Sequence, residues 1–153
     1  RKVFERKSAE CGIELEYMYV DAMAMALVRA PHRFGVVAMP NLFGDVLTDL
    51  GAELQGGLGV SPSANVRPGG TGMFEPVHGS APDIAGKGLA NPFAAILAAA
   101  MMLSDLGFQA EADRVSDAVD ACIAKGLTTP DLGGKLDTPG AGRAVADEVR
   151  SSR

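Results

Sequence analysis

Hydrophobic and polar residues near the N-terminus follow first a helical and then an extended pattern. Residues 1–11 are highly charged and predict a helix that ends at Gly12, because glycine readily adopts the left-handed conformation that closes a helix. Residues 13–20 (IELEYMYV) alternate apolar with polar side chains and predict a strand with one buried face. Residues 22–28 (AMAMALV) are rich in helix formers, and Asp21 is the expected N-cap of that helix.

The middle of the chain predicts another strand and helix, followed by a long segment rich in glycine and proline. Residues 34–39 (FGVVAM) are apolar enough for a short buried strand, and apolar side chains recur at helical spacing over residues 42–54. A short strand is expected near residues 58–66, inside the Gly/Pro/Ser-rich stretch of residues 56–72. The glycines and prolines of residues 73–90 predict mostly loop.

The C-terminal third predicts helices that share a core. Asn91 and Pro92 mark the start of a helix, with asparagine as N-cap and proline at the first helical position, and Gly107 marks its end. A second helix is expected over residues 110–125, and a last short helix over residues 143–149. The side chains expected to face the core are Phe93, Ile96, Leu97, Ala100 and Met101 on the first helix and Val115, Ala118, Val119, Cys122 and Ile123 on the second.

Composition narrows the class of protein. Strand–helix alternations followed by helices favour an α/β layer structure, and 153 residues suffice for one ordinary domain or two partial ones. The net charge of −5 argues against a general nucleic-acid binder. The longest apolar run, residues 93–103, is shorter than the roughly 20 residues of a membrane-spanning helix. Cys11 and Cys122 have no CxxC neighbour, so we interpret both as reduced structural thiols of a cytoplasmic protein.

Candidate chemistry begins with two carboxylates on the helix expected over residues 42–54. Asp45 and Asp49 are four residues apart, so their side chains share one helix face. Two carboxylates on adjacent turns suit a hard divalent cation, but a solvated acidic face has the same pattern. Asp21 stands at the end of a predicted strand, where open α/β sheets bind ligands. With Asp21 as a third carboxylate, both interpretations stay open: a divalent-cation site and a solvated acidic face.

A second candidate is the glycine-rich segment that begins at His78 and ends at Gly88. Its glycines would let a ligand approach the backbone closely, and its His, Asp and Lys could hold a nucleotide. It is not a P-loop, because six residues rather than four separate Gly79 from Gly86, and no GxGxxG, GxSxG or HExxH occurs in the chain. A loop of purely structural turns is the alternative.

Two motifs, taken together, identify a family. Residues 41–49 (NLFGDVLTD) and residues 74–92 (FEPVHGSAPDIAGKGLANP) resemble the β-decarboxylating dehydrogenases, which act on isopropylmalate, isocitrate, homoisocitrate or tartrate. The resemblance extends to about Glu148 and implies the C-terminal part of a two-domain α/β fold, three-layered, with helices packed on a mixed sheet. It also implies that residues 1–55 belong to the dimer-forming, metal-binding domain and residues 56–153 to the cofactor-binding domain.

The resemblance implies a metal site and a cofactor site. Asp45 and Asp49 would hold Mg²⁺ or Mn²⁺, with Asp21 supplied by the partner subunit of a homodimer. NAD would bind along the second motif, with Asp83 on the adenosine ribose. NADP-using members have Lys-Tyr where this chain has Asp83 and Ile84, so NAD is favoured. The implied cofactor-binding residues are Glu75 toward nicotinamide, His78 and Asn91 near adenine, and Gly79, Ser80, Ala81, Asp83 and Ile84.

The implied reaction is a metal-assisted oxidative decarboxylation of a 2-hydroxy acid of the 3-substituted malate type. Residues 41–45 and 80–84 are most similar to the isopropylmalate enzymes of leucine biosynthesis, whereas Met39 and Pro40 are more like NAD-dependent isocitrate members. Isocitrate, homoisocitrate and tartrate or malate therefore stay as alternative substrates.

The resemblance implies no catalytic residue within this chain. The family's substrate arginines, catalytic tyrosine and catalytic lysine are expected upstream of Arg1, so the 153 residues alone are expected to be inactive. A non-catalytic dimerisation or binding module is the alternative from another class. The expected partners are a small 2-hydroxy acid and a second copy of the chain, with neither nucleic acid nor membrane.

Overall fold

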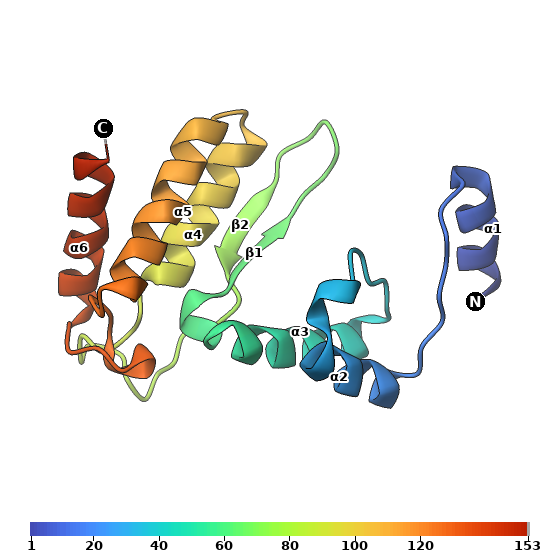
Figure 1. Ribbon diagram of the computed structural model, residues 1–153, viewed down its shortest axis with the longest axis horizontal. Coiled ribbons are helices and arrows are strands. Elements are labelled where there is room, and N and C mark those ends of the chain that lie inside the picture. Colours follow the sequence, from blue (N-terminus) through green and yellow to red (C-terminus); the bar gives the residue numbers. More distant parts are fainter. Residues whose placement is uncertain (153) are drawn as a thin grey trace. The chain divides into compact units, whose positions relative to one another are not determined.

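A computed structural model describes residues 1–152 and divides the chain into two compact units (Figure 1). The N-terminal unit, Arg1–Leu47, contains helices α1 (Lys2–Cys11) and α2 (Val20–Arg29) and the 3₁₀ helix η1 (Pro31–Arg33). Helix α3 (Asn41–Gln55) begins in this unit and ends in the C-terminal unit, which starts at Thr48. The domain division predicted after residue 55 stays a prediction. No helix within residues 1–152 is long and apolar enough to cross a membrane.

Helix α1 confirms the prediction of a charged N-terminal helix that ends at Gly12. Arg1 pairs with Glu5 across one turn at 3.0 Å, and Arg6 pairs with Glu10 at 3.1 Å. Gly12 follows in the left-handed conformation, with φ 64°, and its N–H donates to the Ser8 carbonyl. The helix buries none of its residues, so local ion pairs and the glycine cap account for its form.

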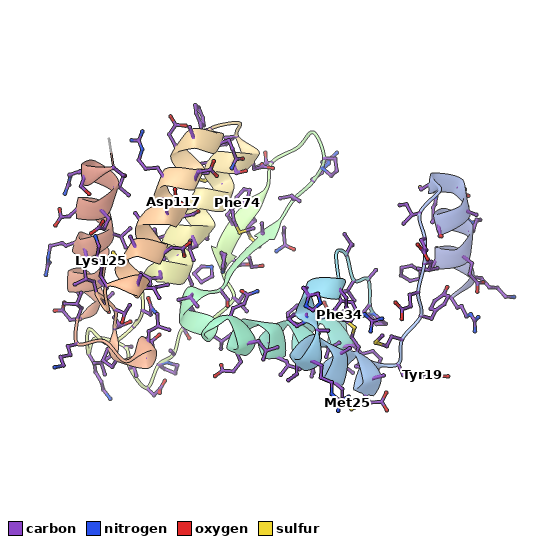
Figure 2. All side chains as sticks on the ribbon, in the orientation of Figure 1. Tyr19, Met25, Phe34, Phe74, Asp117 and Lys125 are labelled. Carbon is purple, nitrogen blue, oxygen red and sulfur yellow. The ribbon has the colours of Figure 1, made fainter. Side chains whose placement is uncertain are left out.

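The two strands predicted in the N-terminal unit are absent. Residues 13–19 and 34–40 are neither helix nor strand, and within residues 1–152 neither segment pairs with another. Most of their apolar side chains are exposed, with Tyr19 87% and Val36 97% accessible, whereas Met18, Phe34 and Met39 are half-buried; Figure 2 shows Tyr19 projecting from the chain. The prediction of strands was wrong because alternation over residues 13–20, or an apolar run over residues 34–39, shows only which side chains could line a sheet, whereas a strand also needs a paired backbone.

Helix α2 starts earlier than predicted. Tyr19, with φ −73° and ψ 151°, holds the N-cap position without a side-chain bond, and Asp21 lies inside the first turn. The prediction of Asp21 as N-cap was therefore wrong. Its Oδ1 instead accepts the Ala22 N–H at 2.8 Å, near the positive end of the helix.

The C-terminal unit is a small layered α/β structure. Strands β1 (Pro62–Asn65) and β2 (Met73–Pro76) form an antiparallel hairpin in which Ser63 is opposite Glu75. Helix α4 (Phe93–Asp105) packs on both strands and on α5 (Gln109–Ala124), which in turn packs on α6 (Thr138–Ser151) (Figure 1). The 3₁₀ helices η2 (Leu58–Val60) and η3 (Pro130–Leu132) lie in the connections. Within the described residues the sheet has these two strands, and β2 lies in a stretch for which loop was predicted.

The core of the C-terminal unit lies between its helices. Phe93, Val119 and Cys122 are completely buried, and they form one cluster with Val60, Ala118, Ala141 and Val145. Met101 and Ile123 were predicted to face the core but are 38% and 41% exposed. Alanines occupy much of the buried face of α4: Ala94, Ala98 and Ala100. On α5 the buried positions are Ala112, Ala118, Val119 and Cys122. Small side chains let neighbouring elements approach closely.

Capping residues set the N-terminal starts of α4 and α6. Pro92 has helical angles, φ −84° and ψ −5°, and Asn91 Oδ1 accepts the Phe93 N–H at 2.9 Å, as predicted for a cap followed by proline. Helix α6 begins five residues before the predicted residue 143, at Thr138. Asp137 caps it by accepting the Gly140 N–H at 2.7 Å, so the Asp-Thr-Pro sequence was an available start signal.

The two cysteines differ in environment. Both are free; Cys11 is exposed and Cys122 is buried, so the structural interpretation suits Cys122 alone. Burial raises the pKa of the Cys122 thiol, and the neighbouring Glu148 carboxylate raises it further.

Iodoacetamide at pH 8 is therefore expected to alkylate Cys11 at least about tenfold faster than Cys122, because the thiolate is the reactive form and a raised pKa leaves less of it. Peptide mass mapping over time measures both rates. Denaturant should make the two rates similar, and equal rates in the native protein would contradict this assignment.

Candidate functional site

The predicted metal-binding carboxylates lie on helices and face solvent. Asp45 and Asp49 are both exposed on α3 and, four residues apart, lie on the same side of the helix. Asn41 Nδ2 donates to Asp45 Oδ2 at 3.0 Å, which orients that carboxylate. Asp21 is exposed in the first turn of α2. Across residues 1–152 no three such acidic, His or Cys side chains gather in one place.

The pair on α3 has the donor chemistry of a hard-cation site. Carboxylate oxygens are the ligands that Mg²⁺ and Mn²⁺ prefer, and Mg²⁺ commonly uses one or two carboxylates together with water and substrate. Asp45 and Asp49 supply that number. Further ligands would have to come from substrate, water or a second subunit.

The predicted cofactor-binding residues lie along one loop, which begins in β2. Glu75 is exposed in β2, and the Val77 N–H, donating to the Ser61 carbonyl at 3.0 Å, fixes the start of the loop. His78 is half-buried, and its Nδ1 lies 3.0 Å from the Gly79 carbonyl oxygen. We call residues 77–90 the cofactor loop.

The middle of the cofactor loop is a series of turns with an accessible backbone. Ala81 has a positive φ of 41°, and its carbonyl accepts the Ile84 N–H at 3.1 Å. Asp83 is exposed. A side chain added at Gly79 or Gly86 would meet nothing within 4 Å, so a ligand can approach the backbone there.

Asn91, directly after the loop, is buried, and both polar atoms of its side chain are hydrogen-bonded. It is 8% exposed; its Nδ2 donates to Asp131 Oδ2 at 2.9 Å while its Oδ1 caps α4. Asp131, in η3, also accepts the Thr129 hydroxyl at 2.5 Å. Sequence reasoning missed Asp131 because its partner is 40 residues away and its Thr-Pro-Asp-Leu-Gly context indicates only a turn.

The start of α6 also holds the cofactor loop. The Thr138 N–H donates to the Gly88 carbonyl at 2.8 Å, and the Thr138 hydroxyl donates to the Ala90 carbonyl. The loop is therefore fixed at both ends, at Val77 and over residues 88–91, and most of its residues between these points are exposed.

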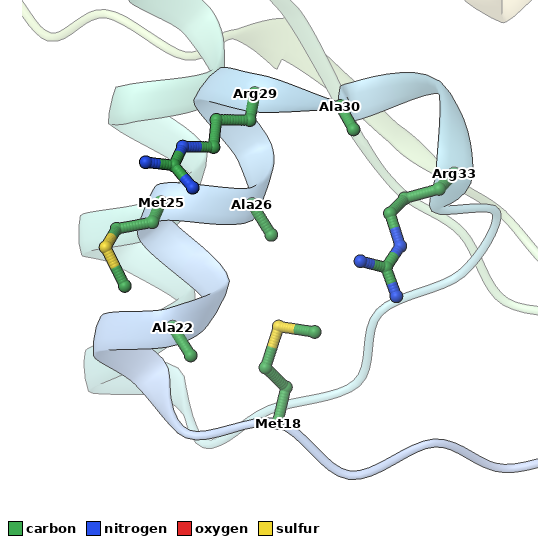
Figure 3. A pocket seen from close by; sticks show the side chains of 7 residues that line it. All are labelled: Met18, Ala22, Met25, Ala26, Arg29, Ala30 and Arg33. Carbon is green, nitrogen blue, oxygen red and sulfur yellow. The ribbon is translucent and has the colours of Figure 1, made fainter.

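A surface hollow of about 410 Å³ lies in the N-terminal unit, and none of the predicted site residues is among those that line it. Figure 3 shows two methionines and two arginines around it, with the Met18 and Arg33 side chains turned toward the space. Its lining is Met18, Ala22, Met25, Ala26, Arg29, Ala30 and Arg33.

Comparison with known proteins gives a consistent result. The family model described as isocitrate/isopropylmalate dehydrogenase matches residues 1–149. A 3-isopropylmalate dehydrogenase of Zymomonas mobilis is 53% identical over 134 residues, which are 87% of this chain and 38% of that protein. An isocitrate/homoisocitrate dehydrogenase of Thermus thermophilus is 52% identical over 91% of this chain and 41% of its own length.

Solved structures similar to this chain belong to the same class of enzymes as these relatives. An isocitrate dehydrogenase from Methylococcus capsulatus superposes with a TM-score of 0.87 and 45% identity, covering 95% of this chain and 44% of that one. The similarity confirms the predicted α/β class and the predicted C-terminal part of that fold. The chain thus spans about two fifths of the length of the curated relatives it matches.

Proposed function

Because the chain belongs to the isocitrate/isopropylmalate dehydrogenase family, we propose that the protein of natural length oxidises and decarboxylates a 2-hydroxy acid of the 3-substituted malate type. The observation that carries the proposal is the cofactor loop, fixed at both ends and mostly exposed between them, with Asp83 presented to solvent. The leading substrate is 3-isopropylmalate; isocitrate, homoisocitrate and tartrate or malate are the alternatives. The resemblance implies that the family's substrate arginines and its catalytic tyrosine and lysine lie outside these 153 residues, and the chain spans about two fifths of its relatives' length, so the activity is proposed for the natural-length protein.

The cofactor proposed is NAD, and the loop suits its adenosine half. The exposed Asp83 carboxylate can accept hydrogen bonds from both ribose hydroxyls and would repel a 2′-phosphate. His78 and Asn91 would lie near adenine, and Glu75 toward nicotinamide. The accessible backbone at Gly79, Ser80 and Ala81 would approach the cofactor closely. When bound, NAD accepts the hydride removed from the substrate.

The metal proposed is Mg²⁺ or Mn²⁺, held by Asp45 and Asp49 of one subunit and Asp21 of the partner subunit. When bound, such an ion acts as a Lewis acid toward the hydroxyl and carboxylate of the substrate. The Asn41 amide, which donates to Asp45, would keep one carboxylate oriented toward the ion. A homodimer is part of this proposal, and exposed apolar side chains on α2, Met25 and Val28, support it. The two free cysteines support a reducing compartment, the cytoplasm.

Replacing Asp49 with asparagine is expected to weaken Mn²⁺ binding by at least about tenfold and to leave NAD binding within twofold, because the amide lacks the charge that a hard cation requires. Calorimetric titration of the natural-length protein with each ligand separates the two effects. D120N, an exposed aspartate on α5, is the matched control and should change neither affinity. Equal losses of metal and NAD binding would identify Asp49 as structural.

The substrate proposal is tested by NADH formation. The natural-length protein, with NAD and Mn²⁺, is supplied in turn with 3-isopropylmalate, isocitrate, homoisocitrate, tartrate and malate. We expect the highest kcat/KM with 3-isopropylmalate. A higher value with another acid corrects the substrate, and no NADH with any of them overturns the proposed reaction.

A further inference from the structure

We propose that Asp131 is a positioning residue: through Asn91 it holds the C-terminal end of the cofactor loop in the form that accepts the adenosine half of NAD. This inference rests on the proposed NAD binding and adds a residue outside the loop to it. Asp131 would act through Asn91, without touching the cofactor.

Three segments of the C-terminal unit meet at this point. Gly59 lies in η2, Asn91 at the start of α4, and Asp131 in η3. The amide of Asn91 joins two of these segments, since Nδ2 donates to Asp131 Oδ2 at 2.9 Å while Oδ1 accepts the Phe93 N–H at 2.9 Å. With 8% exposure and hydrogen bonds at both Nδ2 and Oδ1, the Asn91 side chain is held inside the protein.

The Asp131 carboxylate is itself held in place. Its second oxygen, Oδ1, accepts the hydroxyl of Thr129 at 2.5 Å, and Thr129 is completely buried. A carboxylate that accepts two such bonds cannot rotate without losing one of them. Asp131 is therefore a fixed acceptor to which Asn91 is tied.

Gly59 shows how closely the pair is packed. A Cβ added at Gly59 would come within 2.6 Å of Asp131 Oδ2 and 2.9 Å of Asn91 Cβ. Any side chain at position 59 would push the two partners apart. Since this glycine does not have a positive φ, the reason for glycine here is space and not backbone conformation.

The position of Asn91 matters to the loop because the exposed residues lie just before it. Asp83 and Lys87 are exposed between the bond at Val77 and the bonds over residues 88–91. Releasing Asn91 removes one of the fixed points on the C-terminal side and leaves the bonds of Thr138. The loop should then become more mobile while the helices keep their packing.

A partner exchange tests the proposal. N91D puts a second carboxylate against Asp131 and should raise the Kd for NAD about tenfold, with the Kd for Mn²⁺ unchanged. In the double variant N91D/D131N, the amide introduced at position 131 donates to the carboxylate introduced at position 91. The side chain at position 91 still accepts the Phe93 N–H, and the side chain at position 131 still accepts the Thr129 hydroxyl. We expect it to restore the Kd for NAD to within about twofold of the original.

A second measurement, limited proteolysis, follows the mobility of the loop in the absence of any cofactor. Trypsin should cleave after Lys87 about tenfold faster in N91D than in the original protein and return to the original rate in the double variant. Cleavage after Arg114 in α5 is the internal control for general unfolding and should not change. G59A, which adds no charge, should resemble N91D; G142A, whose Cβ would meet nothing within 4 Å, is its matched control. If N91D does not fold, D131A takes its place with the same expected results.

The outcomes separate this inference from the proposed function. If the original protein does not bind NAD but cleavage after Lys87 follows the predicted pattern, the proposed function fails while the positioning of the loop by Asp131 stands. If the protein binds NAD and N91D changes neither the Kd nor the cleavage, the inference is overturned. Losses in N91D that the double variant does not restore would also overturn it, since they would show that the pairing is not the cause.

Discussion

Replacing Phe93 with alanine is expected to lower the free energy of unfolding of the C-terminal unit by about 3–5 kcal/mol. Phe93 is completely buried and lies in the cluster that joins η2, α4, α5 and α6. Its removal deletes the largest fully buried side chain of that core and leaves a cavity, because the surrounding structure relaxes only partially to fill it.

Denaturant unfolding of the natural-length protein, followed by circular dichroism, measures the change. The matched control is F108A, since Phe108 is 53% exposed at the start of α5 and its truncation should cost less than about 1 kcal/mol. A similar loss for both variants would contradict the placement of the core.

Replacing Asp83 with alanine is expected to reduce the preference for NAD over NADP about a hundredfold. The carboxylate would lose its hydrogen bonds to the two ribose hydroxyls, which weakens NAD, and its repulsion of a 2′-phosphate, which relieves NADP. Each effect of about 1.4 kcal/mol is a factor of ten, and the two multiply in the ratio.

The ratio of kcat/KM for the two coenzymes, with substrate and Mn²⁺ held constant, is the measurement. D120A on α5 should leave this ratio unchanged. If the ratio in the Asp83 variant equals that of the original protein, Asp83 does not contact the ribose and the proposed orientation of NAD on the loop is wrong.

Helices were predictable from the sequence because their signals are local. The glycine after α1, the Asn-Pro start of α4 and the apolar spacing of α3 each lie within a few residues of the element they define. Strands were wrongly predicted over residues 13–20 and 34–39, because neither alternation nor an apolar run can show whether a partner strand is present. Strand β2 was missed because the composition of residues 73–76 does not indicate a strand. Its extended form depends on backbone pairing with β1, which its own residues do not reveal.

The same distinction applies to the candidate site. The cofactor loop could be predicted as a unit because its residues are contiguous in one motif, and Asp45 and Asp49 because they are one helical turn apart. Asp131 could not, since its role depends on a bond to a residue 40 positions away. Asp21 was assigned to a cap from its neighbours alone, whereas the start of α2 is set by the extended backbone of Tyr19.

In the function proposed above, α3 binds the metal and the cofactor loop binds NAD in one enzyme. The most direct measurement is a crystal structure of the natural-length protein with Mn²⁺ and NAD, with the metal located by its anomalous scattering. We expect a manganese peak bound by Asp45 and Asp49 of one subunit and Asp21 of the partner subunit, and the adenosine ribose against Asp83. A manganese peak away from α3, or NAD bound elsewhere than on residues 74–92, would contradict it.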